Sequence, residues 1–153
     1  MSSIQNKFLI FLIILCYIPV LFLGLFDIDE GAFATTSLQM IKQKQYLIPI
    51  IGDELRLEKP ILTYWIQVVS MYAFGANEFA LRAPSIFSSF IWAYCFSNFV
   101  KQHTRNVHRS EIFLNLMTLP GVFIISFAAP ADAFLNLFIT LLMINLLKFF
   151  LPL

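Results

Sequence analysis

Long uncharged stretches alternate with charged segments along the chain. The first stretch, Phe8 to Phe26, contains no charged residue, and about 19 helical residues reach roughly 28 Å, close to the thickness of the hydrocarbon core of a bilayer. A second stretch, Ala83 to Val100, lies between an arginine and a lysine. A third, Ile112 to Leu147, has Asp132 as its single charge and is long enough for two spans joined by a turn at residues 128–132. The pattern predicts about four membrane-spanning helices.

One further uncharged stretch, Pro60 to Asn77, has a different pattern. Polar residues recur in it at helical spacing and leave an apolar face on the other side, as in helices that lie along a membrane surface. The polar residues are Thr63, Gln67, Ser70 and Asn77, and the aromatic residues suited to the headgroup level are Tyr64, Trp65 and Tyr72. We therefore expect an interfacial helix here, preceded by an amphipathic helix from Glu30 to about Lys44.

The composition indicates an all-helical integral membrane protein. Apolar residues make up 59% of the 153 residues, charged residues 12%, and the mean hydropathy is +0.81, whereas a soluble domain carries about a quarter charged residues. So few charges cannot cover a water-facing surface, which excludes a soluble globule. The formal net charge of +1 gives no general attraction to nucleic acid. Cys16 and Cys95 lie in separate apolar stretches, which supports neither a disulfide framework nor a zinc site.

The basic residues predict the orientation of the spans, because short loops rich in lysine and arginine stay on the cytoplasmic side. Lys101, Arg105 and Arg109 stand close together, so their loop and the N-terminus are expected in the cytoplasm. Within a single membrane domain, 1–153, residues 27–82 form the expected outer segment, with six acidic and four basic residues up to position 59. A cleaved signal peptide is the alternative for the first span, but no small-residue cleavage site follows it.

Several acidic residues that interrupt the apolar pattern fall on the outer side under this topology. Asp27, Asp29 and Glu30 directly follow the first span, and Asp132 lies between the third and fourth spans. Ionisable residues embedded in apolar stretches are costly and often functional. The structural alternative is that Asp29 and Asp132 are N-caps of the helices that follow, worth about 1 kcal/mol each. The pattern alone leaves both interpretations open.

The segment from Gly52 to Trp65, GDELRLEKPILTYW, brings charged residues to the membrane surface. It begins with a Gly-Asp turn, after which Arg56 and Lys59 place two cations at headgroup depth. Fixed cations at this depth suit the phosphate of a lipid substrate. The structural alternative is a snorkelling Lys59 paired with Glu58.

Taken in order, these motifs resemble a known enzyme family. An Asp-Glu pair after the first span is followed by YLIP, RLEKPILTYW, FGANEFALRAPS and a D-A-F-L turn, and together they cover residues 26–147. The series resembles the N-terminal part of C-type glycosyltransferases, in particular enzymes similar to the lipid A aminoarabinose transferase and the protein O-mannosyltransferases. The resemblance implies part of that membrane fold. It also implies transfer of a sugar from a polyprenyl-phosphate carrier to a lipid or protein acceptor on the periplasmic face of the inner membrane.

The resemblance assigns roles to individual residues. Asp29 matches the catalytic carboxylate of the first outer loop, with Glu30 as its motif neighbour, and Lys59, beside Arg56, matches the lysine that contacts the carrier phosphate. Asp132 matches a second outer-loop aspartate that shapes the site or binds a metal in some members. A divalent cation at Asp29 and Asp132 is therefore the one cofactor that the resemblance suggests. The implied partners are a polyprenyl-phosphate-linked sugar, a lipid or protein acceptor, and membrane lipids.

Two departures separate the chain from the family pattern. Ala131 stands where relatives often have a polar or basic residue before the second aspartate, and family members are much longer chains. The sequence therefore carries an alternative, in which the chain is a truncated, inactive fragment or a non-catalytic small membrane protein that binds lipid or serves assembly. A transporter component is disfavoured, because the spans are nearly uniform in Phe, Leu and Ile.

Overall fold

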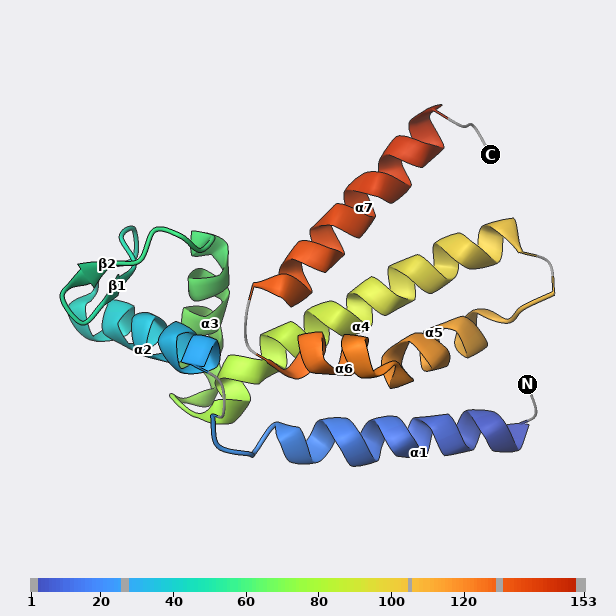
Figure 1. The fold of residues 1–153 in the computed structure, drawn as a ribbon, viewed down its shortest axis with the longest axis horizontal. Helices are drawn as coiled ribbons and strands as arrows, with labels where there is room; N and C mark the ends of the chain where they lie inside the picture. The colour runs from blue at the N-terminus through green and yellow to red at the C-terminus, as the bar shows by residue number, and fades with distance from the viewer. Residues whose placement is uncertain (1–2, 26–27, 105, 129–130, 151–153) are drawn as a thin grey trace.

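A computed structural model describes residues 3–25, 28–104, 106–128 and 131–150 and shows a predominantly helical chain (Figure 1). Asp27 and Arg105, both named above, lie outside the described residues, as do positions 129 and 130 of the predicted turn. In chain order the elements are α1 (Ser3–Val20), α2 (Ile28–Gln43), β1 (Ile50–Ile51), β2 (Glu54–Leu55), α3 (Ile61–Phe74), α4 (Glu78–His103), α5 (Arg109–Thr118), α6 (Pro120–Phe127) and α7 (Asp132–Phe150). The two-residue strands pair as an antiparallel hairpin, so the expectation of an all-helical chain needs this one correction.

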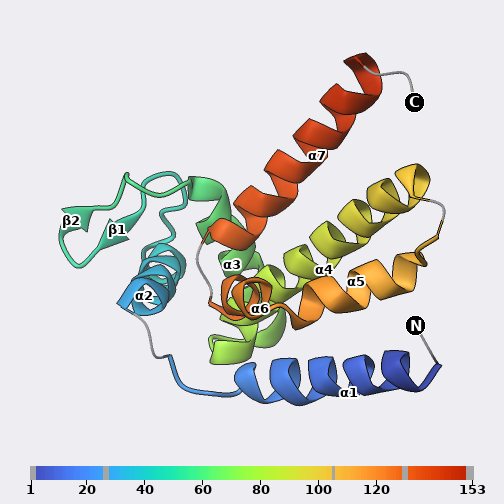
Figure 2. The same cartoon turned by 45° about the vertical axis from the view of Figure 1, so that its right-hand side comes forward.

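Helix α4 is the centre of the arrangement and contacts α3, α5, α6 and α7. Figures 1 and 2 show α7 on one side of α4, and α5, α6 and α1 on the other. Small residues recur at every fourth position of α4 and are buried, namely Ser85, Ser89, Ala93 and Ser97. A row of this kind lets neighbouring helices approach closely, as in helices packed within membranes. The elements α2, β1, β2 and α3 gather at the end of the molecule opposite the start of α1 and the end of α7.

The apolar helices of the structure confirm part of the expected span pattern. Within the described residues, α7 is long and apolar enough to cross a membrane, and α5 with α6 meets the same criterion only as a pair bent by 71°, which is the form of a broken span or of a re-entrant loop. Helices α1 and α3 are apolar but shorter. Large apolar side chains are exposed along α1 and α7, among them Phe8, Phe11, Phe138 and Leu142, as on helices that face lipid. A total of four spans stays a prediction.

The expected third span is broken at Pro120, which the sequence analysis did not predict. Proline lacks the N–H group that a continuing helix needs, so it opens a new helix, α6. Carbonyl groups in the last turn of α5 lose their helical partners at such a break, and the buried Tyr17 hydroxyl donates to one of them, that of Met117, at 3.2 Å. The same hydroxyl lies 3.5 Å from the Ser126 hydroxyl of α6. Tyr17 therefore joins α1 to both halves of the bent pair.

We expect Tyr17→Phe to destabilise the chain by about 1–3 kcal/mol, because it leaves the buried Met117 carbonyl without a donor. Tyr64→Phe is the matched control, since the buried Tyr64 hydroxyl has no hydrogen-bond partner among the described residues. Its loss is expected to be neutral or slightly stabilising. Chemical unfolding in detergent, followed by the helical circular dichroism signal, measures both variants. Equal destabilisation by the two would contradict this account of the bend.

Several helix ends differ from the expected ones. Helix α1 ends at Val20 rather than at Phe26. Helix α2 begins one residue before Asp29, and α7 begins at Asp132 itself, so neither aspartate is an N-cap in this structure. Both carboxylates lie inside the first turn of their helices, where a negative charge still complements the helix dipole.

Candidate functional site

Aromatic packing between α2 and α3 forms the floor of the region around Asp29. Phe33 on α2 and Tyr64 on α3 are both fully buried, and their ring centroids are 5.2 Å apart. The Tyr64 ring therefore packs inside the protein and does not face lipid, and its expected place at headgroup level stays a prediction. Burial raises the pKa of the Tyr64 hydroxyl, while the nearby Arg56 cation acts in the opposite direction.

The hairpin is attached to α2 at its turn. The side-chain amide of Gln39 donates to the Gly52 carbonyl at 2.7 Å and accepts from the Gly52 N–H at 3.1 Å. Gly52 has a φ of +63°, as the turn of a two-residue hairpin requires. The predicted Gly-Asp turn is confirmed, and it directs the chain after β2 back over α2.

Helix α3 packs its polar face inward. Gln67 and Ser70 are buried, and the Ser37 hydroxyl of α2 donates to the Gln67 amide oxygen at 2.8 Å. On the opposite face, Trp65 and Val69 are 40% and 67% exposed. An apolar face left outside in this way suits a helix that lies against lipid. The helix expected within residues 60–77 is present, with its polar face turned toward the protein, and its interfacial position stays a prediction.

Asp29 lies between two cations at the start of α2. Its Oδ1 is 3.6 Å from Nη2 of Arg56, and its Oδ2 is 3.7 Å from Nζ of Lys59. The Arg56 side chain is buried, that of Lys59 is 33% exposed, and that of Asp29 is 53% exposed. Both cations also lie over the ring of Phe33, 5.2 Å and 5.9 Å from its centroid. The structure thus brings together Asp29, Arg56 and Lys59, three of the residues that the sequence analysis singled out.

Glu58 completes this charged group, which we term the Asp29 cluster: Asp29, Arg56, Glu58 and Lys59. Its Oε1 is 3.4 Å from Nε of Arg56, an ion-pair distance without hydrogen-bond geometry, since Nε has no hydrogen-bond partner in the described part of the chain. Lys59 pairs with Asp29. The structural alternative, a pair between Lys59 and Glu58, is not found among the ion pairs of the described residues. Both cations therefore share the Asp29 carboxylate as a common partner.

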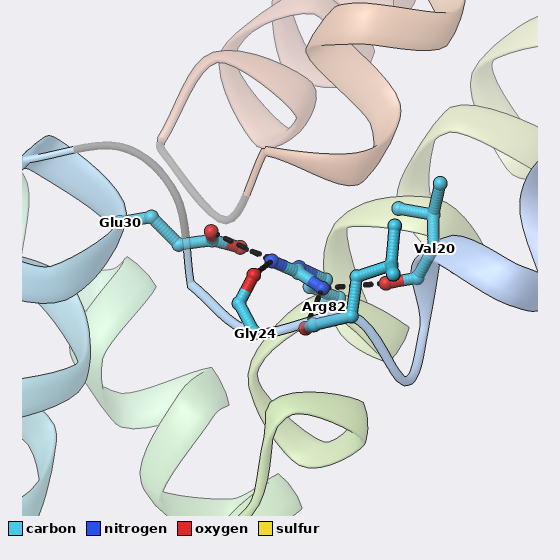
Figure 3. Close-up of polar contacts among 5 residues, drawn as sticks. Val20, Gly24, Glu30 and Arg82 are labelled. Carbon is cyan, nitrogen blue, oxygen red and sulfur yellow. Dashed lines mark hydrogen bonds and ion pairs between the residues drawn. The ribbon is translucent and has the colours of Figure 1, made fainter.

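Glu30, next to Asp29 in the chain, points toward Arg82 (Figure 3). Both side chains are fully buried, and the Glu30 carboxylate accepts from Nε and Nη2 of Arg82, the latter at 2.8 Å. Arg82 also donates to the carbonyls of Val20, the last residue of α1, and of Leu23 and Gly24, which follow it. In the sequence, Arg82 served only to mark the start of the second span. Its position directly before an apolar stretch was the signal that could have identified it as a buried, paired residue.

Asp132 is exposed at the start of α7. Ala131, directly before it, packs against the buried group that includes Phe33 and Tyr64, but no hydrogen bond or ion pair joins Asp132 to Asp29 among the described residues. In the same part of the chain, no group of three or more His, Cys, Asp and Glu side chains is placed to hold a metal ion. A role for Asp132 in the site or at a metal stays a prediction.

The described residues thus form a helical chain with lipid-suited surfaces and a cluster of paired charges at one end. The chain is similar to curated proteins named undecaprenyl phosphate-alpha-4-amino-4-deoxy-L-arabinose arabinosyl transferase. It is 29% identical over 140 residues to that of Wigglesworthia glossinidia brevipalpis, 28% over 134 residues to that of Shewanella sediminis, and 29% over 135 residues to that of Photorhabdus laumondii. These matches confirm the expected resemblance to aminoarabinose transferases.

The similarity covers most of this chain and a minor part of each relative. It extends over 88%, 86% and 86% of the chain, but over 24% of each of the three relatives. The chain therefore spans about a quarter of the length of the curated relatives it matches. No family model matches the chain, and no solved structure matches it at a significant level.

Proposed function

We propose that the chain forms the donor-phosphate site of a glycosyltransferase that moves a sugar from a polyprenyl-phosphate carrier to a lipid or protein acceptor. The observation that carries the proposal is the position of Asp29 between Arg56 and Lys59. The names of the relatives support it, because each specifies an undecaprenyl phosphate-linked sugar. We place the reaction at the periplasmic face of the inner membrane.

Arg56 and Lys59 suit a phosphate because they already bind the two oxygens of one anionic group, the Asp29 carboxylate. Oxygens of a phosphate replace the Asp29 oxygens at Arg56 and Lys59 and accept charge-assisted hydrogen bonds from them. Arg56 is held in place by burial and by its position over Phe33, whereas the more exposed Lys59 adapts to the ligand. An apolar groove of about 550 Å³ between α3 and α4, lined by Val69, Phe74 and Phe87 among others, is suited to an apolar chain.

Displacement by the phosphate leaves Asp29 free to act on the acceptor. The acceptor oxygen attacks the anomeric carbon of the sugar, the bond from that carbon to the carrier phosphate breaks, and the phosphate keeps the bonding electrons. The Asp29 carboxylate takes the proton from the acceptor oxygen as general base. Arg56 and Lys59 offset the charge that develops on the departing phosphate.

The arrangement of the helices supports the proposed orientation. The Asp29 cluster lies at the end of the molecule that holds α2 and α3, whereas the start of α1 lies at the opposite end (Figure 1). A cytoplasmic N-terminus then puts the cluster on the periplasmic side, where a lipid-linked donor and a cell-envelope acceptor meet.

A non-catalytic role is the second candidate, because the two cations paired with Asp29 suit a lipid phosphate whether or not a sugar is transferred. In that case the same cluster binds a phosphorylated lipid without transferring a sugar. An assay of sugar transfer in membranes that contain the chain distinguishes the two functions, because only the glycosyltransferase is expected to form a glycosylated product.

The proposal is tested by comparing two lipids that differ only in the phosphate. We expect the chain in nanodiscs to bind undecaprenyl phosphate about tenfold or more tightly than undecaprenol, since charge-assisted hydrogen bonds contribute about 1.5–3 kcal/mol. Native mass spectrometry of the lipid-bound chain measures both affinities. Equal affinity for the two lipids overturns the proposal.

A further inference from the structure

We propose that Arg82 is a positioning residue that fixes the start of α2 and so directs the Asp29 carboxylate toward the side on which Arg56 and Lys59 lie. Arg82 acts through its ion pair with Glu30, the residue next to Asp29. The inference rests on the proposed function, because the position of Asp29 matters for the reaction only if the Asp29 cluster is the donor site.

The first turn of α2 carries both Asp29 and Glu30. Consecutive residues of a helix project about 100° apart, so Asp29 and Glu30 face different directions. Glu30 is fully buried against Arg82, and Asp29 faces the cations of the cluster. Because one turn carries both carboxylates, holding Glu30 sets the rotation of the helix and hence the direction of Asp29.

Arg82 binds both ends of the connection between α1 and α2. A guanidinium group has five N–H donors in a planar fork, and within the described part of the chain Arg82 donates both to Glu30 and to the carbonyls of Val20, Leu23 and Gly24. One fully buried side chain of α4 thereby joins the end of α1 to the start of α2. Both ends of the connection that leads to Asp29 are fixed to the same group.

The contacts of residue 82 require an arginine and not another cation. Carbonyls after the end of a helix carry partial negative charge and attract a cation. A lysine places three donors at one point and cannot reach a carboxylate and three separate carbonyls at once, whereas the planar fork of arginine can. Arg82→Lys therefore keeps the charge but loses the geometry.

The test is a zero-length crosslink between Asp29 and Lys59. A carbodiimide joins a carboxylate to an amine only when the two are in contact, and Asp29 Oδ2 lies 3.7 Å from Lys59 Nζ. We expect the Asp29–Lys59 crosslink, quantified by mass spectrometry of peptides from the chain in nanodiscs, to fall about tenfold in Arg82→Lys, since small misplacements of a reacting group have effects of this order. Trp92→Phe, which removes the hydrogen bond of 2.8 Å from α4 to Thr140 of α7, is the control and is expected to keep the wild-type yield.

Glu30→Gln is the second variant, because it keeps the bonds of Arg82 to the end of α1 and weakens only its link to α2. A several-fold lower crosslink yield is expected there too. A merely structural Arg82 predicts wild-type yield in every variant with wild-type helicity, and that result overturns the inference. If Arg82→Lys does not fold, the yield in Glu30→Gln decides. The crosslink needs no ligand, so absence of undecaprenyl phosphate binding overturns the proposed function and leaves this measurement unaffected.

Discussion

Arg82→Ala is expected to destabilise the chain by about 3–5 kcal/mol, the usual result of removing one partner of a buried ion pair. The substitution leaves the Glu30 carboxylate buried without its cation and frees the carbonyls of Val20, Leu23 and Gly24. Chemical unfolding in detergent, followed by the helical circular dichroism signal, measures the loss.

Lys59→Ala is the matched control for this variant. It removes one member of an ion pair whose carboxylate is 53% exposed, and such pairs contribute about 0–1 kcal/mol. A loss of stability in Lys59→Ala as large as that in Arg82→Ala would contradict the contrast between a buried and a solvated pair.

Asp29→Asn is expected to lower the rate of sugar transfer by about a hundredfold or more, the effect of removing a general base. The amide is nearly isosteric with the carboxylate but does not take a proton from the acceptor. Binding of undecaprenyl phosphate is expected to persist or to tighten, because Arg56 and Lys59 lose a competing negative charge. Product formation from an undecaprenyl-phosphate sugar, in membranes that contain the chain, measures the rate.

Asp53→Asn provides the control for Asp29→Asn. Asp53 is an exposed aspartate at the hairpin turn, in the same outer segment of the chain. Its substitution is expected to leave transfer within twofold of wild type, roughly the range of surface changes remote from a site. A weakened binding of undecaprenyl phosphate in Asp29→Asn would indicate that Asp29 orders the cations for the ligand, contrary to the displacement described above.

Local patterns in the sequence predicted the elements that build the site. The polar residues at helical spacing indicated α3, the amphipathic stretch after the first span indicated α2, and the Gly-Asp pair indicated the hairpin turn. Arg56 and Lys59 follow that turn directly, so their common placement at the surface was also visible. Their meeting with Asp29 was expected from the resemblance to the glycosyltransferases, because no local rule relates residues so distant in the sequence.

The interior of the site could not be predicted in the same way. Glu30 and Arg82 are separated by 52 positions, and a charge pattern does not say which of several acids an arginine meets in the fold. The direction of the polar face of α3 was equally undetermined, because an amphipathic pattern defines two faces without naming what covers each. In the structure the polar face of α3 packs against α2, where the Gln67 amide oxygen accepts a hydrogen bond from the Ser37 hydroxyl.

The break at Pro120 was missed for a different reason. The Pro-Gly pair at positions 120 and 121 was present in the sequence, but the length and apolarity of the stretch favoured an unbroken span. Proline is tolerated within membrane helices when neighbouring groups satisfy the freed carbonyls. Here the Tyr17 hydroxyl donates a hydrogen bond to one freed carbonyl, that of Met117, and the helix bends at this point.

The most direct test of the central claim is the affinity of the chain for undecaprenyl phosphate in nanodiscs, compared between wild type, Lys59→Ala and Lys42→Ala. Lys42 is an exposed lysine in the last turn of α2 and serves as the matched control. We predict that Lys59→Ala weakens binding about tenfold to a hundredfold, as expected for the loss of a charge-assisted hydrogen bond to phosphate, while Lys42→Ala binds as wild type does. Equal affinity of all three proteins would show that the phosphate does not bind at the Asp29 cluster.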